Sequence, residues 1–539
     1  MVRPWTIRRS FSFTRPRVRD CRARTRPADR ALLNASFATG LPREALIAID
    51  VGTSGARAAV FGLDGRRHFE IRRRYPTHVP RPGWAEQDAR LWQSNALAVL
   101  GAAIRTLGSR RRVLAVGLTG QCPSVVGVDA SGQPVTPGLI YRDNRAIAEA
   151  AALRRRFGSE ALHARTGHVP AAFHVGPKIL WLRRHRPEDF RRTRWFLQPR
   201  DLVGQVLTGE VATDGTHAAA TLFLDLHGRR WDESLIDALN LDLGTLPPLR
   251  GSWEVLGNLR PSLMRRFGLA DAVPIVLGGA DSQACALGAG VVSPGPVSEM
   301  AGSSTCLNAV VVRPISSLAV THYTHVVPGV LTTETGINTT GAAVEWLARL
   351  LFGGRAGRLS GADFERLDRE VGAVEPGAEG VLALPVLGGG ERTDPTLRAA
   401  FTGVSDRHGR GTLMRAMYEG VAYTIHGQLE LLRSCGVPVE ELRISGGDAR
   451  LAAWNQLKAD VVGVPVGRVA GDAAVTGIAM LAGMAAGVYR DLADALAQCV
   501  HLEAWFYPRP AAQLIYASRY PMWATLYRSS VARRRPDNR

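Results

Sequence analysis

The clearest run of apolar and polar positions begins at Leu46. The segment LIAIDVGTSGARAAVFGLDG predicts a strand, a tight polar turn and a second strand, and the pair Asp64-Gly65 then predicts the turn of a further hairpin. Residues 1–43 show no sustained apolar periodicity, and this pattern predicts a disordered segment.

A second segment repeats this pattern about 250 residues later. VSEMAGSSTCLNAVV, residues 297–311, again places a Gly/Ser/Thr turn between two apolar-leaning runs. A third glycine-rich turn follows a short strand that ends near Ser445. There Gly446 and Gly447 precede a helical spacing of apolar residues, namely Leu451, Trp454, Leu457 and Val461.

Between the two hairpins, VPIVLGGADSQACALGAG (273–290) predicts a strand that runs into Gly278-Gly279 and then a helix that begins near Asp281. Spacing alone favours Asp281 as a helix N-cap, the commoner role of Asp in such a place. The functional alternative is a carboxylate that accepts the proton of an attacking hydroxyl.

The small residues of the first turn suggest an anion site. Turns built from Gly, Thr and Ser let backbone amides and hydroxyls approach a phosphate, and Arg57 could add a charge-assisted contact. An ordinary surface hairpin is the simpler alternative for either turn alone. Two such hairpins in equivalent places of two halves would grip one polyphosphate from both sides, so the repeat favours the phosphate interpretation.

Composition sets the class of protein. A chain of 539 residues predicts at least two large domains, and 46% hydrophobic with 21% charged residues is typical of a globular protein. No stretch of about 18 apolar residues predicts a membrane span. The six cysteines are scattered without a ligand-like spacing, which argues against a disulfide scaffold or a zinc site and favours a reducing, cytoplasmic setting.

The net charge of +19 is concentrated at the start of the chain, where residues 1–43 hold eleven arginines against two aspartates. Three interpretations remain open for this segment: a solvated tail or mis-assigned start, a basic arm for an acidic partner, and an Arg-rich transit peptide. We expect no nucleic-acid partner, because no helix-turn-helix pattern precedes the first strand.

Taken in order from about Leu46 to Tyr520, these segments resemble the FGGY family of carbohydrate kinases, actin-like phosphotransferases that include xylulokinase and glycerol kinase. DVGTSGAR and AGSST resemble the two phosphate loops, GGADSQACALGAG the catalytic stretch and SGGDARLAAWNQLKADVVGVPV the adenosine motif. The other matching segments are RPGWAEQDARLWQ (81–93), PKILWLRRHRPEDF (177–190), LTGEVATDGTHAA (207–219), TGAAVEWL (340–347), LGGGERTDP (387–395) and RAMYEGVAYTI (415–425).

The resemblance implies an α/β fold of two actin-like, ribonuclease-H-like domains with a catalytic cleft between them. It implies a disordered basic extension over 1–43, an N-terminal domain over 44–290, a C-terminal domain over 291–525 and a basic tail over 526–539. A cytoplasmic enzyme that uses ATP and Mg²⁺ is expected, with a small sugar or polyol as its partner and a homodimer as one assembly.

The resemblance also assigns roles. Asp281 would be the general base, in place of the N-cap that spacing favours, and Asp50 would lie near magnesium through water. Phosphate and nucleotide would contact Thr53, Ser54, Arg57, Gly302, Ser303, Gly341, Gly446 and Gly447. Trp181, Trp231 and Glu391 are expected to be structural.

Departures from the family pattern concern the acceptor. Xylulokinases typically carry Gln-Met-His where this chain has Gln121, Cys122 and Pro123, and they often carry Asn where it has Ser282. These four residues and Asp281 are the expected substrate contacts. A ketopentose such as xylulose is the expected acceptor, with glycerol, erythritol, ribulose or a hexulose as alternatives. Asp448, in place of a frequent third glycine, would either accept hydrogen bonds from adenosine or face solvent.

Two functions of another class remain as alternatives. A catalytically weak, sugar-sensing relative is one, although Asp281 stands where the base belongs. An actin-like or chaperone-like ATPase is the other, and it would share the hairpins but not the ordered series from GWAEQD to GGADSQ.

Overall fold

The hydrophobic run at Leu46 forms the central strand of a six-stranded sheet. In this computed structural model, which describes residues 40–108, 110–351, 361–387 and 397–532, β1 (Glu44–Val51) pairs antiparallel with β2 (Gly55–Phe61) and parallel with β5 (Arg112–Gly120). The sheet order is β13-β14-β5-β1-β2-β3, with β3 at Arg67–Arg74, β13 at Val255–Asn258 and β14 at Pro274–Ala280. The predicted strand, turn, strand and further hairpin are confirmed.

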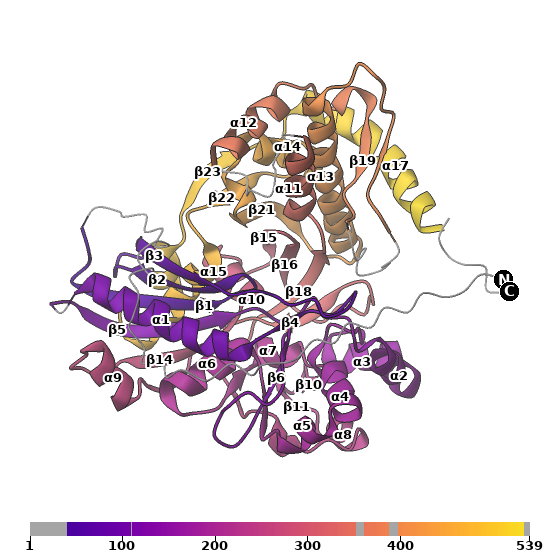
Figure 1. Ribbon diagram of the computed structural model, residues 1–539. Coiled ribbons are helices and arrows are strands. Elements are labelled where there is room, and N and C mark those ends of the chain that lie inside the picture. Colours follow the sequence, from indigo (N-terminus) through magenta and orange to yellow (C-terminus); the bar gives the residue numbers. More distant parts are fainter. Residues whose placement is uncertain (1–39, 109, 352–360, 388–396, 533–539) are drawn as a thin grey trace, which may run out of the picture. The chain divides into compact units, whose positions relative to one another are not determined.

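Successive side chains of β1 point to opposite faces of this sheet, and those on each face pack against helices. Ile47 and Ile49 belong to one apolar cluster with helices α1 (Ala89–Leu107) and α6 (Pro199–Thr208). Leu46 and Ala48 point the other way, into a cluster with α10 (Asp281–Gly288) and α15 (Ala473–Ala485), and Figure 1 shows α1 and α15 beside the strands. A strand that is buried on both faces has few polar positions, so β1 is almost continuously hydrophobic.

A second sheet, of seven strands, repeats the pairing pattern of the first. Its β15 (Gly295–Ala301) pairs antiparallel with β16 (Thr305–Val311) and parallel with β21 (Val439–Gly446). The order is β17-β18-β16-β15-β21-β22-β23, with β17 at Thr321–Thr324, β18 at Leu331–Ile337, β22 at Val466–Val469 and β23 at Leu502–Phe506. The predicted second hairpin is therefore present, and it takes the place in this sheet that β1 and β2 take in the first.

Helices of the second half enclose their own core. Met417 and Leu429 of α13 pack with Trp454 of α14, and all three side chains are buried. The helices that carry this core are α11 (Gly341–Leu351), α12 (Gly361–Gly372), α13 (Arg410–Ser434), α14 (Ala452–Val462) and α17 (Pro510–Ala532). Figure 1 shows α11, α12, α13 and α14 grouped around the strands labelled β21 and β22.

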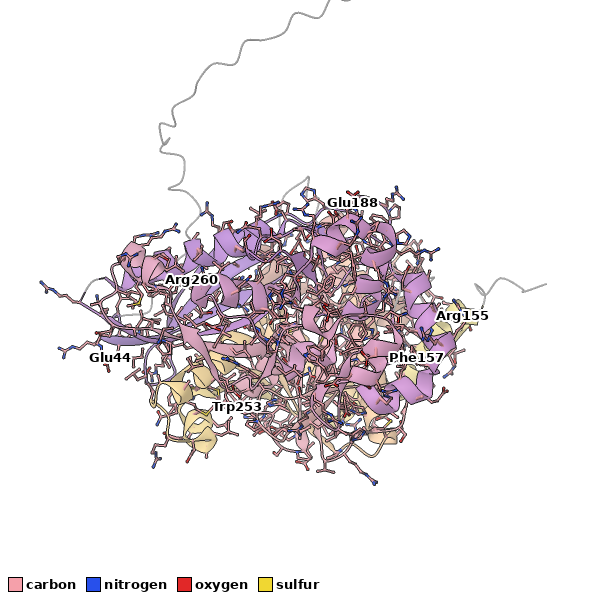
Figure 2. All side chains as sticks on the ribbon, turned by 90° about the horizontal axis from the view of Figure 1, so that it is seen from below. Glu44, Arg155, Phe157, Glu188, Trp253 and Arg260 are labelled. Carbon is pink, nitrogen blue, oxygen red and sulfur yellow. The ribbon has the colours of Figure 1, made fainter. Side chains whose placement is uncertain are left out.

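The long segment between β5 and β14 forms a separate apolar cluster beside the first sheet. It contains the short strands β6 (Val126–Val128), β7 (Gly138–Leu139) and β8 (Trp195–Leu197), and the helices α2 (Ile147–Phe157), α3 (Ser159–Thr166), α4 (Val175–His185), α5 (Pro187–Arg192) and α8 (Glu233–Ala238). Trp181 is buried in this cluster against Trp84, so its expected structural role is confirmed. Figure 2 shows Arg155, on α2, and Glu188, on α5, near the edge of the molecule in that view, whereas Phe157 at the end of α2 is partly buried against the cluster.

Several expectations fall on parts of the chain without a described structure. Residues 1–39 of the basic extension, Glu391 with most of the segment 387–395, and residues 533–539 of the tail lie outside the described residues. The described helices include none that is both long enough and apolar enough to cross a bilayer. The domain boundaries stay predictions.

Candidate active site

The first hairpin brings Asp50 and Arg57 face to face. They are direct partners across β1 and β2, and Arg57 Nε donates to Asp50 Oδ2 at 2.8 Å. The same guanidinium donates to Asp472, the N-cap residue of α15, and lies 3.7 Å from Glu70 Oε2. Arg57 therefore lies among three carboxylates, and its contact with a phosphate stays a prediction.

One carboxylate oxygen of Asp50 is available to a ligand. Its Oδ1 is buried and has no hydrogen-bond partner among the described residues. Burial raises the pKa of this carboxyl group, and Arg57 opposes that shift. Hard divalent cations take oxygen ligands, and Mg²⁺ usually keeps several waters. The unused buried oxygen therefore fits the expected magnesium contact through water.

Hydrogen bonds to backbone carbonyls fix the turn between the two strands. Gln87 Nε2 donates to the Thr53 carbonyl at 2.7 Å, and the Tyr75 hydroxyl donates to the Gly52 carbonyl. The Thr53 side chain hydrogen-bonds Tyr141. The side chain of Ser54 at the tip is exposed. Side chains outside the turn hold it through its backbone carbonyls. The hydroxyl of Ser54 takes no part in these bonds and is open to solvent.

The second hairpin is fastened to the start of α11. The carbonyls of Gly302 and Ser303 accept hydrogen bonds from the amides of Gly341 and Ala342, at 3.0 and 3.2 Å. A Cβ atom at Gly341 would lie 2.5 Å from the Gly302 carbonyl oxygen. The close approach of two backbones requires glycine at position 341.

This close approach gives a prediction for Gly341→Ala. The added methyl group must push α11 from the turn of the second hairpin, which we expect to cost about 1–3 kcal/mol of stability and to raise the KM for ATP. Thermal unfolding and initial rates against ATP concentration measure both effects. Gly411→Ala on α13 is the matched control, because its methyl group would meet nothing closer than 3.4 Å. Equal KM values for the two variants would contradict the assignment of Gly341 to the nucleotide side.

The glycine pair after β21 forms a tight turn. Gly446 has φ +121° and a Cβ there would lie 1.9 Å from the Ala301 carbonyl oxygen, whereas a Cβ at Gly447 would meet nothing within 4 Å. A short 3-10 turn, Asp448–Arg450, separates the pair from the predicted helix, which is α14 and begins at Ala452, directly after Leu451. Trp454, which the helical spacing included, is buried.

Asp448 lies against the start of α11. Its Oδ2 would be 2.8 Å from a Cβ atom at Gly341, and burial raises the pKa of its carboxyl group to about 6, with Lys458 opposing. Lys458 itself forms a buried ion pair with Glu299. Of the two alternatives for Asp448, this placement favours the nucleotide side, and the hydrogen bond to adenosine stays a prediction.

Asp281 is the first residue of α10 and does not cap it. The N-cap position belongs to Ala280, which makes no capping hydrogen bond through a side chain, and Asp281 Oδ1 accepts only a hydrogen bond of 2.9 Å from the amide of Ser282. The N-cap role that spacing alone favours is therefore wrong. The helix begins one residue earlier than a capping Asp281 would require.

The surroundings of Asp281 raise the pKa of its carboxyl group. Burial, and then repulsion from the carboxylates of Asp50 and Glu334, raise the pKa of Asp281 to about 8, while the Ser282 amide and Arg57 oppose the shift. A base must match its proton affinity to the working pH, and carboxyl groups in such roles are often raised toward neutrality. The raised pKa fits the predicted role of Asp281 as a general base, and that role stays a prediction.

The residues expected to contact the sugar, Gln121 to Pro123, follow directly after β5. Gln121 Nε2 donates to Gln87 Oε1 at 2.9 Å, and Gln87 in turn reaches the Thr53 carbonyl of the hairpin. Gln121 Oε1 is buried without a hydrogen-bond partner within the part of the chain that the structure describes. An amide oxygen placed in this way can accept a hydrogen bond from a sugar hydroxyl.

A buried lysine supports the neighbouring turn. Cys122 and Pro123 are joined by a cis peptide bond, and Lys178 Nζ donates to the carbonyls of Pro123 and Ile140 at 3.3 and 2.8 Å. Burial lowers the pKa of Lys178 to about 7, although Asp143 and Cys122 oppose the shift. Burial raises the pKa of the Cys122 thiol, so it stays protonated and contributes shape and not reactivity to this turn.

Ser282 faces the second sheet. Its Oγ donates to Glu334 Oε2 on β18 at 3.0 Å, and both side chains are buried. The next residue of α10, Gln283, donates to Asn308 Oδ1 and accepts from Thr332 Oγ1, both at 2.8 Å. The first turn of the helix that carries Asp281 is thus fastened to β16 and β18.

Sequence reasoning missed several residues of this site. Gln87 lies within the quoted segment GWAEQD but received no role, and a charged residue in the Thr-rich run of β18 was the available signal for Glu334. Asp472 gave no signal, because its partner Arg57 lies 415 residues away along the chain.

Two sheets of the same pairing pattern, each with a Gly/Ser/Thr hairpin, and a carboxylate at a helix start beside the first hairpin are the arrangement expected of an actin-like phosphotransferase. Family comparison makes the assignment specific. Residues 45–288 match the N-terminal domain and residues 298–486 the C-terminal domain of the FGGY family of carbohydrate kinases, and the chain belongs to this family.

Similar proteins agree with the family and its fold. The chain is 30% identical over 493 residues to the xylulose kinase of Escherichia coli (strain K12), covering 89% of this chain and 98% of that protein. It is 29% identical over 503 residues to the autoinducer-2 kinase of Klebsiella pneumoniae subsp. pneumoniae, covering 89% and 93%. The crystal structure of xylulose kinase from Rhodospirillum rubrum has a TM-score of 0.81 at 30% identity and covers 90% of this chain and 98% of that chain.

These comparisons confirm the expected family, the two-domain actin-like fold and the enzyme class. The protein is a carbohydrate kinase whose substrate is a small sugar. The individual contacts of Asp50, Asp281 and the loop glycines with ligands stay predictions.

Proposed function

We propose that the protein transfers the terminal phosphoryl group of ATP to a hydroxyl group of a ketopentose such as xylulose, with Asp281 as the general base. One observation carries the proposal. Gly120, which directly precedes Gln121, is the sheet partner of Val51, next to Asp50, and of Ala280, next to Asp281. The strand ends that carry the predicted phosphate, acceptor and base residues therefore lie side by side.

Phosphoryl transfer depends on positioning and on charge neutralisation more than on covalent chemistry. Thr53 and Ser54 of the first turn and Gly302 and Ser303 of the second would line the phosphates, and Gly341, Gly446 and Gly447 would border the nucleotide. Asp50 would hold Mg²⁺ through water, and the bound ion would neutralise charge on the transferring group. The chain's own residues would then orient the acceptor and remove its proton.

Asp281 would accept the proton of the attacking hydroxyl through its free carboxylate oxygen, because Oδ1 is the atom that bonds the Ser282 amide. Gln121 and Ser282 would hold other hydroxyl groups of the acceptor. Both residues are fixed by hydrogen bonds of their own, to Gln87 and to Glu334, so each would meet the sugar in a set orientation.

The raised pKa gives a testable pH dependence. The base works only when deprotonated, so kcat/KM for the sugar should rise about tenfold per pH unit below pH 7 and level off above about pH 8. Initial rates at saturating ATP from pH 5.5 to 9.5 measure the profile. A kcat/KM that stays constant from pH 6 to pH 9 would contradict the assignment of Asp281 as the base.

One comparison supports a different phosphoryl acceptor. The autoinducer-2 kinase of Klebsiella pneumoniae is nearly as similar to this chain as the xylulose kinase of Escherichia coli, and it is named for another acceptor. A panel of ketopentoses, ketohexoses, pentitols, erythritol, glycerol and autoinducer-2, with coupled detection of ADP, distinguishes these acceptors. The proposal requires the highest kcat/KM for a ketopentose.

A further inference from the structure

We propose that Gln87 is a positioning residue for phosphoryl transfer, because its one side-chain amide joins the turn of the first hairpin to Gln121 and makes Gln121 present an oxygen atom to the acceptor. The inference rests on the proposed function, in which Gln121 is a substrate contact. It adds a residue that would touch neither substrate and would act on both of them through its hydrogen-bond partners.

All the hydrogen-bonding capacity of the Gln87 side chain is used. Its Nε2 donates to the Thr53 carbonyl at 2.7 Å and to Thr77 Oγ1 at 2.8 Å. Its Oε1 accepts from Trp92 Nε1 at 2.8 Å and from Gln121 Nε2 at 2.9 Å. An amide has two N–H donors and two acceptor lone pairs, so these four bonds satisfy it. Only 1% of Gln87 is exposed, so solvent has little access to them.

The neighbours of Gln87 allow its amide only one orientation. An indole N–H can only donate and a backbone carbonyl can only accept. A half-turn of the amide would place an N–H group against the Trp92 N–H and an oxygen against the Thr53 carbonyl. The Trp92 ring is itself held against Gly138, where a Cβ atom would lie 2.4 Å from the ring. Gly138 on β7 is in turn the sheet partner of Gln87 on β4 (Glu86–Gln87).

The orientation of Gln87 fixes that of Gln121. Because Gln121 Nε2 donates to Gln87 Oε1, the oxygen of the Gln121 amide is the atom left for another partner. This oxygen is buried and accepts no hydrogen bond from the residues that the structure describes. Buried acceptors without a partner are rare in folded proteins. A hydroxyl group of a bound acceptor would supply the missing donor.

Gln87 also sets the position of one turn relative to the other. The backbone N–H of Gln121 donates to the Val51 carbonyl at 3.0 Å, so Gln121 is fixed to the end of β1 that carries Asp50. Its side chain then reaches the turn after β1 through two consecutive bonds, from Gln121 to Gln87 and from Gln87 to the Thr53 carbonyl. The turn expected to contact the sugar and the turn expected to contact phosphate therefore share one support.

Gln87→Met tests this role, because it keeps an unbranched side chain of similar length and removes all four bonds. We expect KM for the sugar to rise about tenfold and KM for ATP at least about threefold, with kcat lowered less than about threefold. A loss of folded enzyme would instead lower kcat alone. Thr77→Val is the matched control, because it removes only the Gln87 bond that leads to neither turn, and both KM values should stay within about twofold of the wild type.

A double-mutant cycle tests whether Gln87 acts on the sugar through Gln121. Gln121→Met alone should raise KM for the sugar about tenfold, and the variant with both substitutions should match it, because two residues that support one contact are not additive. KM for ATP should respond to Gln87→Met and not to Gln121→Met. A KM for the sugar that rises in the double variant by the product of the two single effects, about 100-fold, would overturn the inference.

The outcomes separate this inference from the proposed function, because the acceptor with the highest kcat/KM serves as the sugar. If the wild type phosphorylates an acceptor but Gln87→Met leaves both KM values unchanged, or Thr77→Val raises them as much, Gln87 has only a structural role and the kinase activity stands. If no acceptor supports turnover, calorimetric binding of xylulose to the wild type and to Gln87→Met decides the inference. Equal affinities, or no binding to either protein, would then overturn it.

Gln87→Glu decides the inference if Gln87→Met does not fold. It keeps the oxygen to which Trp92 and Gln121 donate, and it places a second oxygen against the Thr53 carbonyl. At pH 8.5, where a carboxylate that accepts two hydrogen bonds is ionised, KM for the sugar should stay within about threefold of the wild type while KM for ATP rises at least about threefold. An unchanged KM for ATP, or a larger rise in KM for the sugar than in KM for ATP, would overturn the inference.

Discussion

Asp281→Asn should lower kcat by about 10²–10⁴-fold while leaving KM for ATP near that of the wild type, because the loss of a positioned general base removes proton transfer from the transition state and not nucleotide binding. Coupled ADP release at saturating sugar and ATP measures the effect. Asp271→Asn is the control: Asp271 is an exposed residue paired with Arg112, and its change should leave kcat unchanged.

The same substitution has an opposite effect on stability. The pKa of Asp281 is raised by folding, so the native protein holds this proton more tightly than the unfolded chain does, and the group lowers stability as pH rises from about 4 through about 8. Asn carries no charge to bury. Asp281→Asn should therefore unfold at a higher temperature than the wild type at pH 8, and the difference should shrink toward pH 4. Lower kcat together with a lower Tm at pH 8 would instead indicate a structural defect.

Arg57→Met should be the most destabilising change at the site. Among the described residues, it removes the one side chain that contacts all of Asp50, Asp472 and Glu70, and it leaves partly buried carboxylates without their shared partner. Removal of one member of a buried ion pair typically costs about 3–5 kcal/mol. Urea unfolding of the variant and the wild type at pH 7 measures the loss.

The pH dependence of this loss has a definite sign. Although burial acts to raise it, Arg57 holds the pKa of Asp472 below its ordinary value, so this contribution is present at neutral pH and is lost as pH falls through the lowered pKa. The difference in unfolding free energy between the variant and the wild type should therefore narrow as pH falls below about 4, through the lowered pKa of Asp472. Arg72→Met is the matched control, because Arg72 contacts only Glu70 of these carboxylates and is 63% exposed, and its change should cost less than about 1 kcal/mol. Equal losses for the two variants would show that Arg57 is not the centre of the cluster.

Local sequence patterns predicted those parts of the fold in which neighbours along the chain also pair in space. The hairpins β1–β2 and β15–β16 follow from apolar runs around small polar turns, and β14 followed by α10 follows from a run that ends in two glycines. The role of Asp281 as a cap was wrong because a helix start cannot be placed to one residue from spacing alone, and the first turn tolerates Asp at more than one position.

The contacts that distinguish this site were not predictable in the same way. Asp472 meets Arg57, and Glu334 meets Ser282, only because strands from the two halves of the sequence and α10 and α15 pack together. Such pairs leave no periodic signal in a single sequence. The resemblance to a family supplied roles for Asp50, Asp281 and the glycine turns, but it said nothing of Gln87, Lys178 or Glu334, whose partners become visible only in the fold.

The measurement that tests the central claim most directly is detection of the phosphorylated product when purified protein is incubated with Mg²⁺, ATP carrying a labelled terminal phosphate and xylulose. Mass spectrometry of the sugar fraction should show the label on a sugar phosphate, formed at a rate equal to ADP release and absent with Asp281→Asn. Release of labelled inorganic phosphate without labelled product from any sugar of the panel would contradict the account and would favour an ATPase of the same fold.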